Sequence, residues 1–239
     1  MDQGHAAGRM SQNVLVLGGA TEGGIGAAIV DRLTVLGHYV TAPDEDTVDI
    51  LQPWGVSALE LALDECQPTS VVYAIGVNEL EWSWKIDRDS FDRVIAANVW
   101  GFIQLITSLQ ETGRAYSVLA ITSDAAYRPM RTSIAYCASK AALDMAIRIA
   151  SRELAVEGWR VNGLAPGKVE GTAMTRYVDN RVMEIRHFAS REVAEQYEMF
   201  GNPLRRKLEA SEVADVACDV LLSPVMGWTG DIVTVNGGR

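Results

Sequence analysis

The segment YCASK places Tyr136 and Lys140 four residues apart, near the start of a helical pattern. Side chains with this spacing lie on one face of a helix, one turn apart. A phenol has an ordinary pKa near ~10 and is a poor base at neutral pH, but a neighbouring ammonium favours its phenolate form. The pair could therefore transfer a proton at a carbon that bears oxygen, with Lys140 tuning Tyr136. The same spacing is also common in surface pairs, so other residues must support this interpretation.

Ser123 offers that support, because it follows a predicted buried strand, Tyr116 to Thr122. Doubly wound folds bind their ligands at the carboxyl ends of the strands. A serine hydroxyl at this edge could hold the oxygen of a carbonyl group.

A glycine-rich segment, GGATEGGIG at residues 18–26, stands between a strand pattern and a helix pattern. Backbone without side chains at this place lets a pyrophosphate approach the amino end of the helix. The segment alone could equally be a tight strand-to-helix connection. We predict that a dinucleotide binds here, at Gly18, Gly19, Gly24, Ile25 and Gly26.

Two acidic residues bear on the choice of cofactor. Asp44, at the end of the second predicted strand, could accept hydrogen bonds from an adenosine ribose and repel a 2′-phosphate. Glu22 adds a negative charge inside the glycine-rich segment. Both favour NAD over NADP, although Asp44 could also be an ordinary turn residue of the acidic DEDTVD stretch.

The elements that must position these residues alternate along the chain. Predicted strands cover 13–17, 38–42, 70–75, 116–122, 160–164 and 231–235, and predicted helices cover 27–36, 56–65, 91–111, 136–157 and 210–222. This alternation predicts an α/β fold with a Rossmann-type doubly wound parallel sheet flanked by helices. No repeat or linker divides the chain, so we expect a flexible arm at 1–11 and a single domain at 12–239. The polar stretch 172–207 breaks the alternation and is a candidate active-site lid.

Composition argues against several classes of function. The 239-residue chain has a net charge of −10 and no run of Lys and Arg, so we expect neither nucleic acid nor a membrane as a partner. No stretch approaches the ~18 apolar residues of a membrane span, and the first residues lack a signal-peptide pattern. Cys66, Cys137 and Cys218 are widely separated, which predicts reduced thiols and no metal site. A cytoplasmic location is expected.

These motifs together resemble the short-chain dehydrogenase/reductase family, from NVLVLGG at residue 13 to TVNGG ending at residue 238. The family's Tyr-x-x-x-Lys corresponds to Tyr136 and Lys140. Its active-site serine precedes the tyrosine by thirteen positions, as Ser123 does, and its asparagine falls in NVWG as Asn98. The resemblance thus fills all four catalytic positions.

The resemblance also extends to the cofactor site. Pro166 and Gly167 match the Pro-Gly that passes the nicotinamide, and Asp49 resembles the aspartate that contacts the adenine ring. Thr172 resembles the threonine that binds the carboxamide. The resemblance implies further cofactor contacts at Gly76 and Val169.

Several departures from the family pattern stand out. Gly18 replaces a threonine, and the span from Gly19 to Gly24 is one residue longer, so the pyrophosphate loop must bulge. The usual Asn-Asn-Ala-Gly reads YAIG at 73–76 and loses amides that tie adjacent strands together. One residue is inserted between Val169 and Thr172, and the link between the second and third strands is short.

The resemblance implies an NAD(H)-dependent oxidoreductase that interconverts a secondary alcohol and a ketone. Tyr136 would act as acid or base, Ser123 would steady the oxygen, and Lys140 would also hold the ribose. Asn98 would hold a water that links Lys140 to solvent. The related enoyl reductases use a Tyr-Lys spacing of seven, so reduction of a carbon-carbon double bond is not expected.

The sequence says less about the substrate and the oligomeric state than about the catalytic residues. Trp82, Trp84, Tyr127, Met174 and Tyr177 are predicted to wall a pocket for a hydrophobic ketone or alcohol, although each aromatic could serve packing instead. Helix patterns at 99–109 and 141–154 are apolar on more than one face, and the family resemblance points to a homotetramer or homodimer. Two alternatives remain: a non-catalytic, cofactor-binding regulatory homologue, and an epimerase or dehydratase that retains NAD through its cycle.

Overall fold

The structure of the protein, a computed structural model, describes residues 11–44 and 46–239. Apart from Ser11, the arm predicted at 1–11 lies outside these residues. The strands are β1 (Asn13–Leu17), β2 (Tyr39–Thr41), β3 (Ser70–Tyr73), β4 (Ser117–Ile121), β5 (Arg160–Pro166) and β6 (Ile232–Val235). The α-helices are α1 (Ile25–Val35), α2 (Pro53–Cys66), α3 (Arg88–Ile95), α4 (Gly101–Glu111), α5 (Ile134–Leu154), α6 (Ala173–Arg186), α7 (Arg191–Met199) and α8 (Ala210–Leu221).

The strands form one parallel sheet in the order β2-β1-β3-β4-β5-β6. The chain moves outward from β1 to β2 and then crosses back to β3 on the other side of β1. The carboxyl ends of β1 and β3 therefore flank the crevice in which doubly wound folds bind ligands. The predicted α/β fold with a doubly wound parallel sheet is confirmed.

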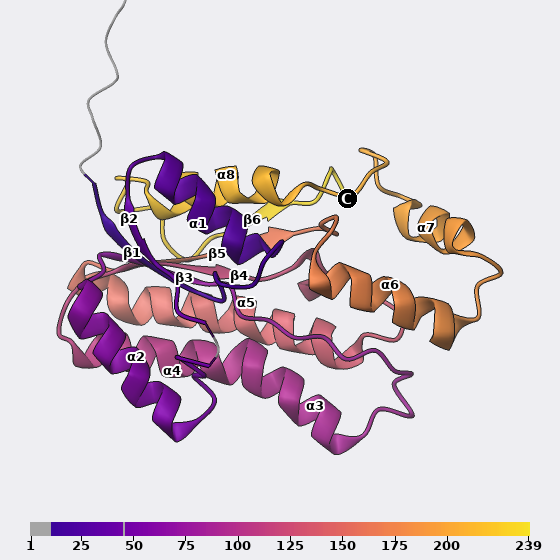
Figure 1. Ribbon diagram of the computed structural model, residues 1–239, viewed down its shortest axis with the longest axis horizontal. Helices are drawn as coiled ribbons and strands as arrows, with labels where there is room; N and C mark the ends of the chain where they lie inside the picture. The colour runs from indigo at the N-terminus through magenta and orange to yellow at the C-terminus, as the bar shows by residue number, and fades with distance from the viewer. Residues whose placement is uncertain (1–10, 45) are drawn as a thin grey trace, which may run out of the picture.

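Helices cover both faces of the sheet (Figure 1): α1 and α8 lie on one face, and α2, α4 and α5 lie on the other. Successive side chains of a strand point to opposite faces, so an uninterrupted apolar strand serves two cores. In β1, Leu15 and Leu17 belong to the core cluster with residues of α2, α4 and α5. Val14 and Val16 belong to the cluster with residues of α1 and α8.

The single helix predicted over 91–111 is wrong in one respect. The chain forms α3, then a π-helical turn at Ala96–Trp100, then α4. The π-helical turn carries Asn98, whose buried side chain bonds to backbone and side-chain atoms of other segments. Such single wide turns inside helices often mark functional positions.

The predicted lid segment 172–207 contains α6 and α7, which extend beyond one end of the sheet (Figure 1). Thr172 caps α6, because its hydroxyl accepts a 3.0 Å hydrogen bond from the backbone amide of Thr175. A partly buried carboxylate, Asp179 of α6, pairs with Lys168 after β5 and with Lys207 before α8. These ion pairs fasten α6 to the body of the domain.

None of the helices within the described residues has the length and apolar character needed to cross a membrane.

Candidate active site

A cavity of about 1270 Å³ opens at the carboxyl ends of β1, β3, β4 and β5. Sites for single small ligands commonly measure ~300–1,000 Å³, so this cavity has room for a dinucleotide together with a second molecule. The residues predicted from sequence that line it are Gly18, Gly24, Ile25, Gly26, Asp44, Asp49, Gly76, Ser123, Tyr136, Lys140, Pro166, Gly167, Val169 and Thr172. Gly19 and Asn98 are not among its lining residues.

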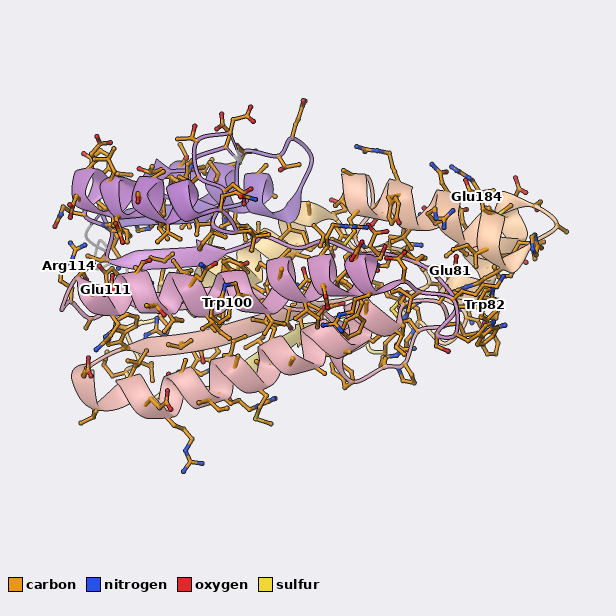
Figure 2. All side chains as sticks on the ribbon, turned by 90° about the horizontal axis from the view of Figure 1, so that it is seen from below. Glu81, Trp82, Trp100, Glu111, Arg114 and Glu184 are labelled. Carbon is orange, nitrogen blue, oxygen red and sulfur yellow. The ribbon has the colours of Figure 1, made fainter. Side chains whose placement is uncertain are left out.

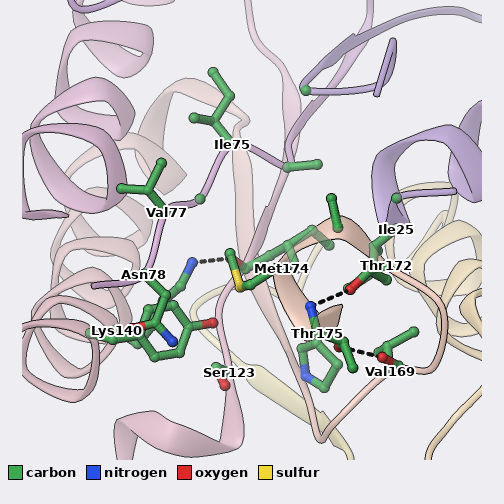
Figure 3. Close-up of a pocket in the computed structure, with 18 of the residues that line it drawn as sticks. Ile25, Ile75, Val77, Asn78, Ser123, Lys140, Val169, Thr172, Met174 and Thr175 are labelled. Carbon is green, nitrogen blue, oxygen red and sulfur yellow. Dashed lines mark hydrogen bonds between the residues drawn. The ribbon is translucent and has the colours of Figure 1, made fainter. Parts of the chain in front are cut away.

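Tyr136 and Lys140 both lie in the first turns of α5 and are buried. The Lys140 Nζ donates a 2.9 Å hydrogen bond to the carbonyl oxygen of Ile121 and lies 5.7 Å from the centre of the Tyr136 ring. Ser123 follows β4, and its hydroxyl accepts a hydrogen bond from the Ala125 amide at 3.2 Å. In Figure 3, Ser123 and Lys140 lie on one side of the cavity and Ile25 lies on the other.

Burial is the largest influence on the pKa values of Tyr136 and Lys140. It raises the pKa of Tyr136 to about 12, while a hydrogen bond with Ser123 lowers it and the charge of Asp124 raises it further. Burial also lowers the pKa of Lys140 to about 8, against an opposing effect of Asp144. In the protein alone, burial therefore outweighs the other influences on the pKa of Tyr136. The tuning of Tyr136 by Lys140, expected beside an oxidised nicotinamide ring, stays a prediction.

Asn98 lies directly behind the cavity wall. Its Nδ2 donates to the carbonyl oxygen of Val77 at 2.9 Å and to the Ser139 hydroxyl at 2.8 Å, and its Oδ1 accepts from the Val77 amide at 2.8 Å. A Cβ on Gly76 would lie 3.6 Å from the Asn98 Oδ1 and 3.4 Å from the Lys140 Nζ. Asn98 therefore fixes the segment after β3 against α5, and only the glycine backbone separates it from the cavity.

The glycine-rich turn accommodates its extra residue through two left-handed glycines, Gly18 with φ +81° and Gly23 with φ +69°. Gly26 packs so closely that a Cβ there would lie 2.2 Å from the Gly18 carbonyl oxygen. Gly19 instead faces the side chains of neighbouring core residues, which explains its absence from the cavity wall. Glu22 is exposed and also does not line the cavity.

The amino end of α1 suits a diphosphate. Gly24 is its N-cap residue and provides no side-chain cap, and the first turn contains no acidic residue. The first amides of a helix lack intrahelical partners, and the helix dipole favours an anion beside them. Gly24, Ile25 and Gly26 all line the cavity. The Gly24 amide donates to the Thr21 carbonyl oxygen at 3.1 Å, so the amides of Ile25 and Gly26 are the ones available to a ligand.

Asp44 and Asp49 line the part of the cavity beyond β2. The Asp44 Oδ1 accepts hydrogen bonds from the Thr47 amide and hydroxyl, and these bonds lower the pKa of the carboxyl. Asp44 is thus a turn residue and a cavity residue at once. The Asp49 Oδ1 accepts a 3.0 Å hydrogen bond from the Leu51 amide. The uncapped helix and these carboxylates fit the diphosphate and the adenosine of a dinucleotide.

The predicted substrate wall is mostly wrong. Of its five residues only Met174 lines the cavity, where it lies between Lys140 and Thr172 in Figure 3. Trp82 stacks on Trp84 with ring centres 5.0 Å apart, at the end of the molecule that also holds Glu184 of α6 (Figure 2). The hydroxyls of the other two predicted residues bond elsewhere, that of Tyr127 to Asn236 and that of Tyr177 to Glu79.

Four arginines that sequence reasoning missed line this end of the cavity instead, together with several apolar residues. The arginines are Arg128, Arg131, Arg186 and Arg239, and the apolar and aromatic residues include Met130, Met174, Val178, Tyr197 and Phe200. The arginines come from three separate segments and form no run of charge. No sequence signal could have grouped them before the fold was known.

The three cysteines are unpaired, and among the described residues no three His, Cys, Asp or Glu side chains gather as a metal ion would require.

Comparisons with known proteins show the family to which the chain belongs. A family model described as enoyl-(acyl carrier protein) reductase matches residues 68–239. The chain belongs to the short-chain dehydrogenase/reductase family. It is 26% identical to sorbitol-6-phosphate 2-dehydrogenase of Klebsiella pneumoniae, over 95% of each chain. It is 29% identical to acetoacetyl-CoA reductase of Synechocystis, over 96% of this chain and 97% of that protein. A match to L-xylulose reductase of Caenorhabditis elegans is 34% identical but covers 64% of this chain and 59% of that one.

Solved structures show the same fold. A short-chain dehydrogenase family protein from Francisella tularensis superposes with a TM-score of 0.83 at 22% identity, covering 95% of this chain and 98% of that one. Aldohexose dehydrogenase from Thermoplasma acidophilum gives a TM-score of 0.81 at 21% identity, covering 95% and 94%. Together with the family match, the sequence relatives identify an oxidoreductase of the kind that acts on alcohols and ketones.

Proposed function

We propose that the protein is an NAD(H)-dependent enzyme that interconverts a secondary alcohol and a ketone on a small molecule. The observation that carries the proposal is the convergence of Ser123, Tyr136 and Lys140 in one cavity with the uncapped amino end of α1. Acid-base groups and a diphosphate cradle in a single cavity are what this reaction requires.

Each residue of the catalytic set has a distinct task. The Ser123 hydroxyl would donate a hydrogen bond to the substrate oxygen, and Tyr136 would give or take the proton of that oxygen. Lys140 would hold the cofactor ribose and, when protonated, favour the phenolate of Tyr136. Asn98 would position the backbone beside Lys140 through its bonds to Val77. NAD, when bound, supplies or accepts the hydride.

The cofactor would be held by the residues predicted from sequence, with its diphosphate at Gly24, Ile25 and Gly26 and its adenosine toward Asp44 and Asp49. The preference for NAD over NADP rests on Asp44, whose carboxylate would repel a 2′-phosphate. Because Glu22 lies outside the cavity wall, it is not a basis for this preference. The nicotinamide would lie near the loop from Pro166 to Thr172, which includes Gly167 and Val169.

The names of the relatives bear on the substrate. Sorbitol-6-phosphate 2-dehydrogenase and acetoacetyl-CoA reductase are named for substrates that carry phosphate groups, and L-xylulose reductase is named for a sugar. A polar substrate is in keeping with the arginines of the cavity, and we propose it in place of the hydrophobic ketone or alcohol expected from sequence.

A cofactor-exchange assay tests the proposal. Purified protein is titrated with NADH and NADPH by fluorescence and then assayed with NAD and NADP against a panel of secondary alcohols and ketones. We expect turnover with NAD, and a loss of at least ~10²-fold in kcat for Tyr136→Phe with cofactor binding retained. Tyr39→Phe, at an exposed tyrosine of β2, is the matched control and should keep full activity.

Three results would contradict the proposal. Tight NADH binding without turnover would favour the non-catalytic, regulatory alternative, and bound NAD that never exchanges would favour an epimerase or dehydratase. A clear preference for NADP would overturn the role given to Asp44.

We further propose that the protein is a cytoplasmic homotetramer or homodimer. The outer face of α4, α5 and the π-helical turn, within the helical layer seen in Figure 2, exposes the apolar side chains of Trp100, Ile103, Met145 and Ile149. Large apolar side chains exposed on neighbouring helices commonly mark a subunit interface. Sedimentation equilibrium would decide between these assemblies and a monomer.

A further inference from the structure

The cavity has a cationic end. Arg128 and Arg131 belong to the loop between Ser123 and Tyr136, so they stand close in sequence to both catalytic residues. Arg186 ends α6, and Arg239 is the last residue of the sequence. We call these four residues the arginine cluster. The acidic residues of the described cavity wall are Asp44, Asp46 and Asp49 on the side of β2, and Asp124 beside the arginine cluster.

Asp124 is a single carboxylate beside four arginines and offsets only part of the positive charge of this cluster. Its carboxylate is buried, and its Oδ2 lies 3.8 Å from the Arg128 Nη1, a distance too long for a hydrogen bond. Burial raises the pKa of Asp124, while the charges of Arg128 and Arg239 lower it. The Arg128 Nη1 is itself buried and has no hydrogen-bond partner among the described residues. A buried guanidinium nitrogen usually donates to an acceptor, and an anion in the cavity would supply one.

Arg131 and Arg186 are held beside each other at the same end. The Arg186 side chain donates to the carbonyl oxygen of Arg131 and, from its Nε at 3.2 Å, to the Thr132 hydroxyl. The Arg131 guanidinium lies over the Trp82 ring, 5.2 Å from its centre. Each of these contacts is with a neutral group, and each orients a guanidinium.

We propose that Arg128, Arg131 and Arg186 bind an anionic group, a carboxylate or a phosphate ester, on the alcohol or ketone that the enzyme converts. Guanidinium groups pair with such oxyanions through parallel N–H donors, which would orient the substrate as well as retain it. A cationic pocket in a chain of net charge −10 also concentrates anions at the catalytic end. The apolar side chains of Met130, Met174 and the other apolar residues of this wall would contact the carbon skeleton. The inference rests on the proposed function.

Binding of inorganic phosphate tests the site without turnover. The protein is saturated with NADH, so that the diphosphate cradle is filled, and phosphate is titrated by calorimetry at low ionic strength. We expect saturable binding that weakens at least ~10-fold in Arg131→Gln and in Arg186→Gln, since a charged pair is lost. Arg88→Gln is the control, because that side chain is 85% exposed, pairs with Asp92 and does not line the cavity. Phosphate binding that NADH abolishes would assign the arginines to the cofactor and overturn the proposal.

Matched substrates test the same site during turnover. Keto acids are compared with their methyl esters, and sugar phosphates with the free sugars, at saturating cofactor. We expect kcat/KM to favour the anionic member of each pair by at least ~10-fold, and Arg131→Gln and Arg186→Gln to remove most of that preference. Arg186→Lys retains the charge and should retain part of the preference, which guards against a glutamine variant that fails to fold.

The outcomes separate this inference from the proposed function. Equal turnover of both members of each pair, unchanged by the arginine variants, would overturn the anion site and leave the alcohol-ketone activity intact. Absence of turnover with every substrate, alongside phosphate binding that depends on Arg131 and Arg186, would overturn the proposed activity and support the anion site. Absence of phosphate binding together with absence of turnover would overturn both.

Discussion

The buried hydroxyl of Tyr73 donates a 2.5 Å hydrogen bond to the carbonyl oxygen of Ala97, within the π-helical turn that carries Asn98. A π-helical turn shifts the regular hydrogen-bond pattern of a helix, and buried carbonyl groups need partners. Tyr73, at the end of β3, thus connects the central sheet to the turn that positions Asn98. Its ring also packs edge-on against Phe102, with ring centres 5.9 Å apart.

Tyr73→Phe removes this hydrogen bond while keeping the ring. The buried carbonyl of Ala97 would lose its side-chain donor, so we expect the free energy of unfolding to fall by about 1–3 kcal/mol in urea denaturation. We also expect kcat to fall, because Asn98 is held less firmly beside Lys140. Tyr116→Phe, which removes a 2.8 Å hydrogen bond to Thr112 away from the cavity, should lose stability but keep kcat. Equal kcat in the two variants would argue against a link between Tyr73 and the site.

This relationship also shows where sequence reasoning ends. The apolar run at 13–17 and the glycines after it predict strand, turn and helix, because local residue types dictate those elements. The pattern also shows that Tyr73 stands where the family has an asparagine, but not what its hydroxyl reaches. One wide turn changes the spacing of apolar residues along a helix very little. The sequence pattern of 91–111 therefore could not predict the π-helical turn.

The residues that line the cavity could likewise be predicted from sequence only in part. Residues of the predicted glycine, serine and tyrosine motifs mostly line it, because each motif is fixed by the strand end or helix end that carries it. The substrate wall depends on how the loop 124–133 and α6 meet, which is a matter of side-chain packing between distant segments. The predicted aromatic wall is therefore wrong. No sequence pattern could have predicted that Arg131 and Arg186 lie together.

Gly26→Ala should test the glycine-rich turn. The added methyl group would lie 2.2 Å from the backbone oxygen of Gly18, and a backbone atom cannot move aside as a flexible side chain can. We expect NADH affinity to fall at least ~10-fold and the thermal unfolding midpoint to drop, as when overpacking costs ~1–3 kcal/mol. Gly227→Ala is the matched control, since a Cβ there meets nothing within 4 Å and the backbone is not left-handed. Wild-type NADH affinity in Gly26→Ala would refute the close packing of this turn.

Lys140→Met should change how stability depends on pH. Burial lowers the pKa of Lys140 in the folded protein to about 8, from 10.5 for an ordinary lysine. Between these values the unfolded chain binds more protons than the folded one, so the lysine makes stability rise with pH across that window. At ~1.4 kcal/mol per pKa unit, the full effect is about 3 kcal/mol.

Urea unfolding at pH 8 and pH 10 measures this effect. The difference in unfolding free energy between wild type and Lys140→Met should shift in favour of wild type as pH rises. Lys85→Met, at an exposed lysine, is the control and should follow the pH dependence of wild type. A parallel pH dependence in Lys140→Met and wild type would mean that Lys140 is not held in a desolvated environment.

Asp124→Asn should shift the pH profile of alcohol oxidation. After burial, which raises the pKa of Tyr136 most, the negative charge of Asp124 raises it further, against the lowering effect of Ser123. Removing that charge makes the phenolate less costly, so the acidic limb of the kcat/KM profile should move to lower pH. Asp219→Asn, on the exposed face of α8, removes the same charge far from the cavity and should leave the profile unchanged. A shift to higher pH, or an equal shift in both variants, would show that the charge of Asp124 does not act on Tyr136.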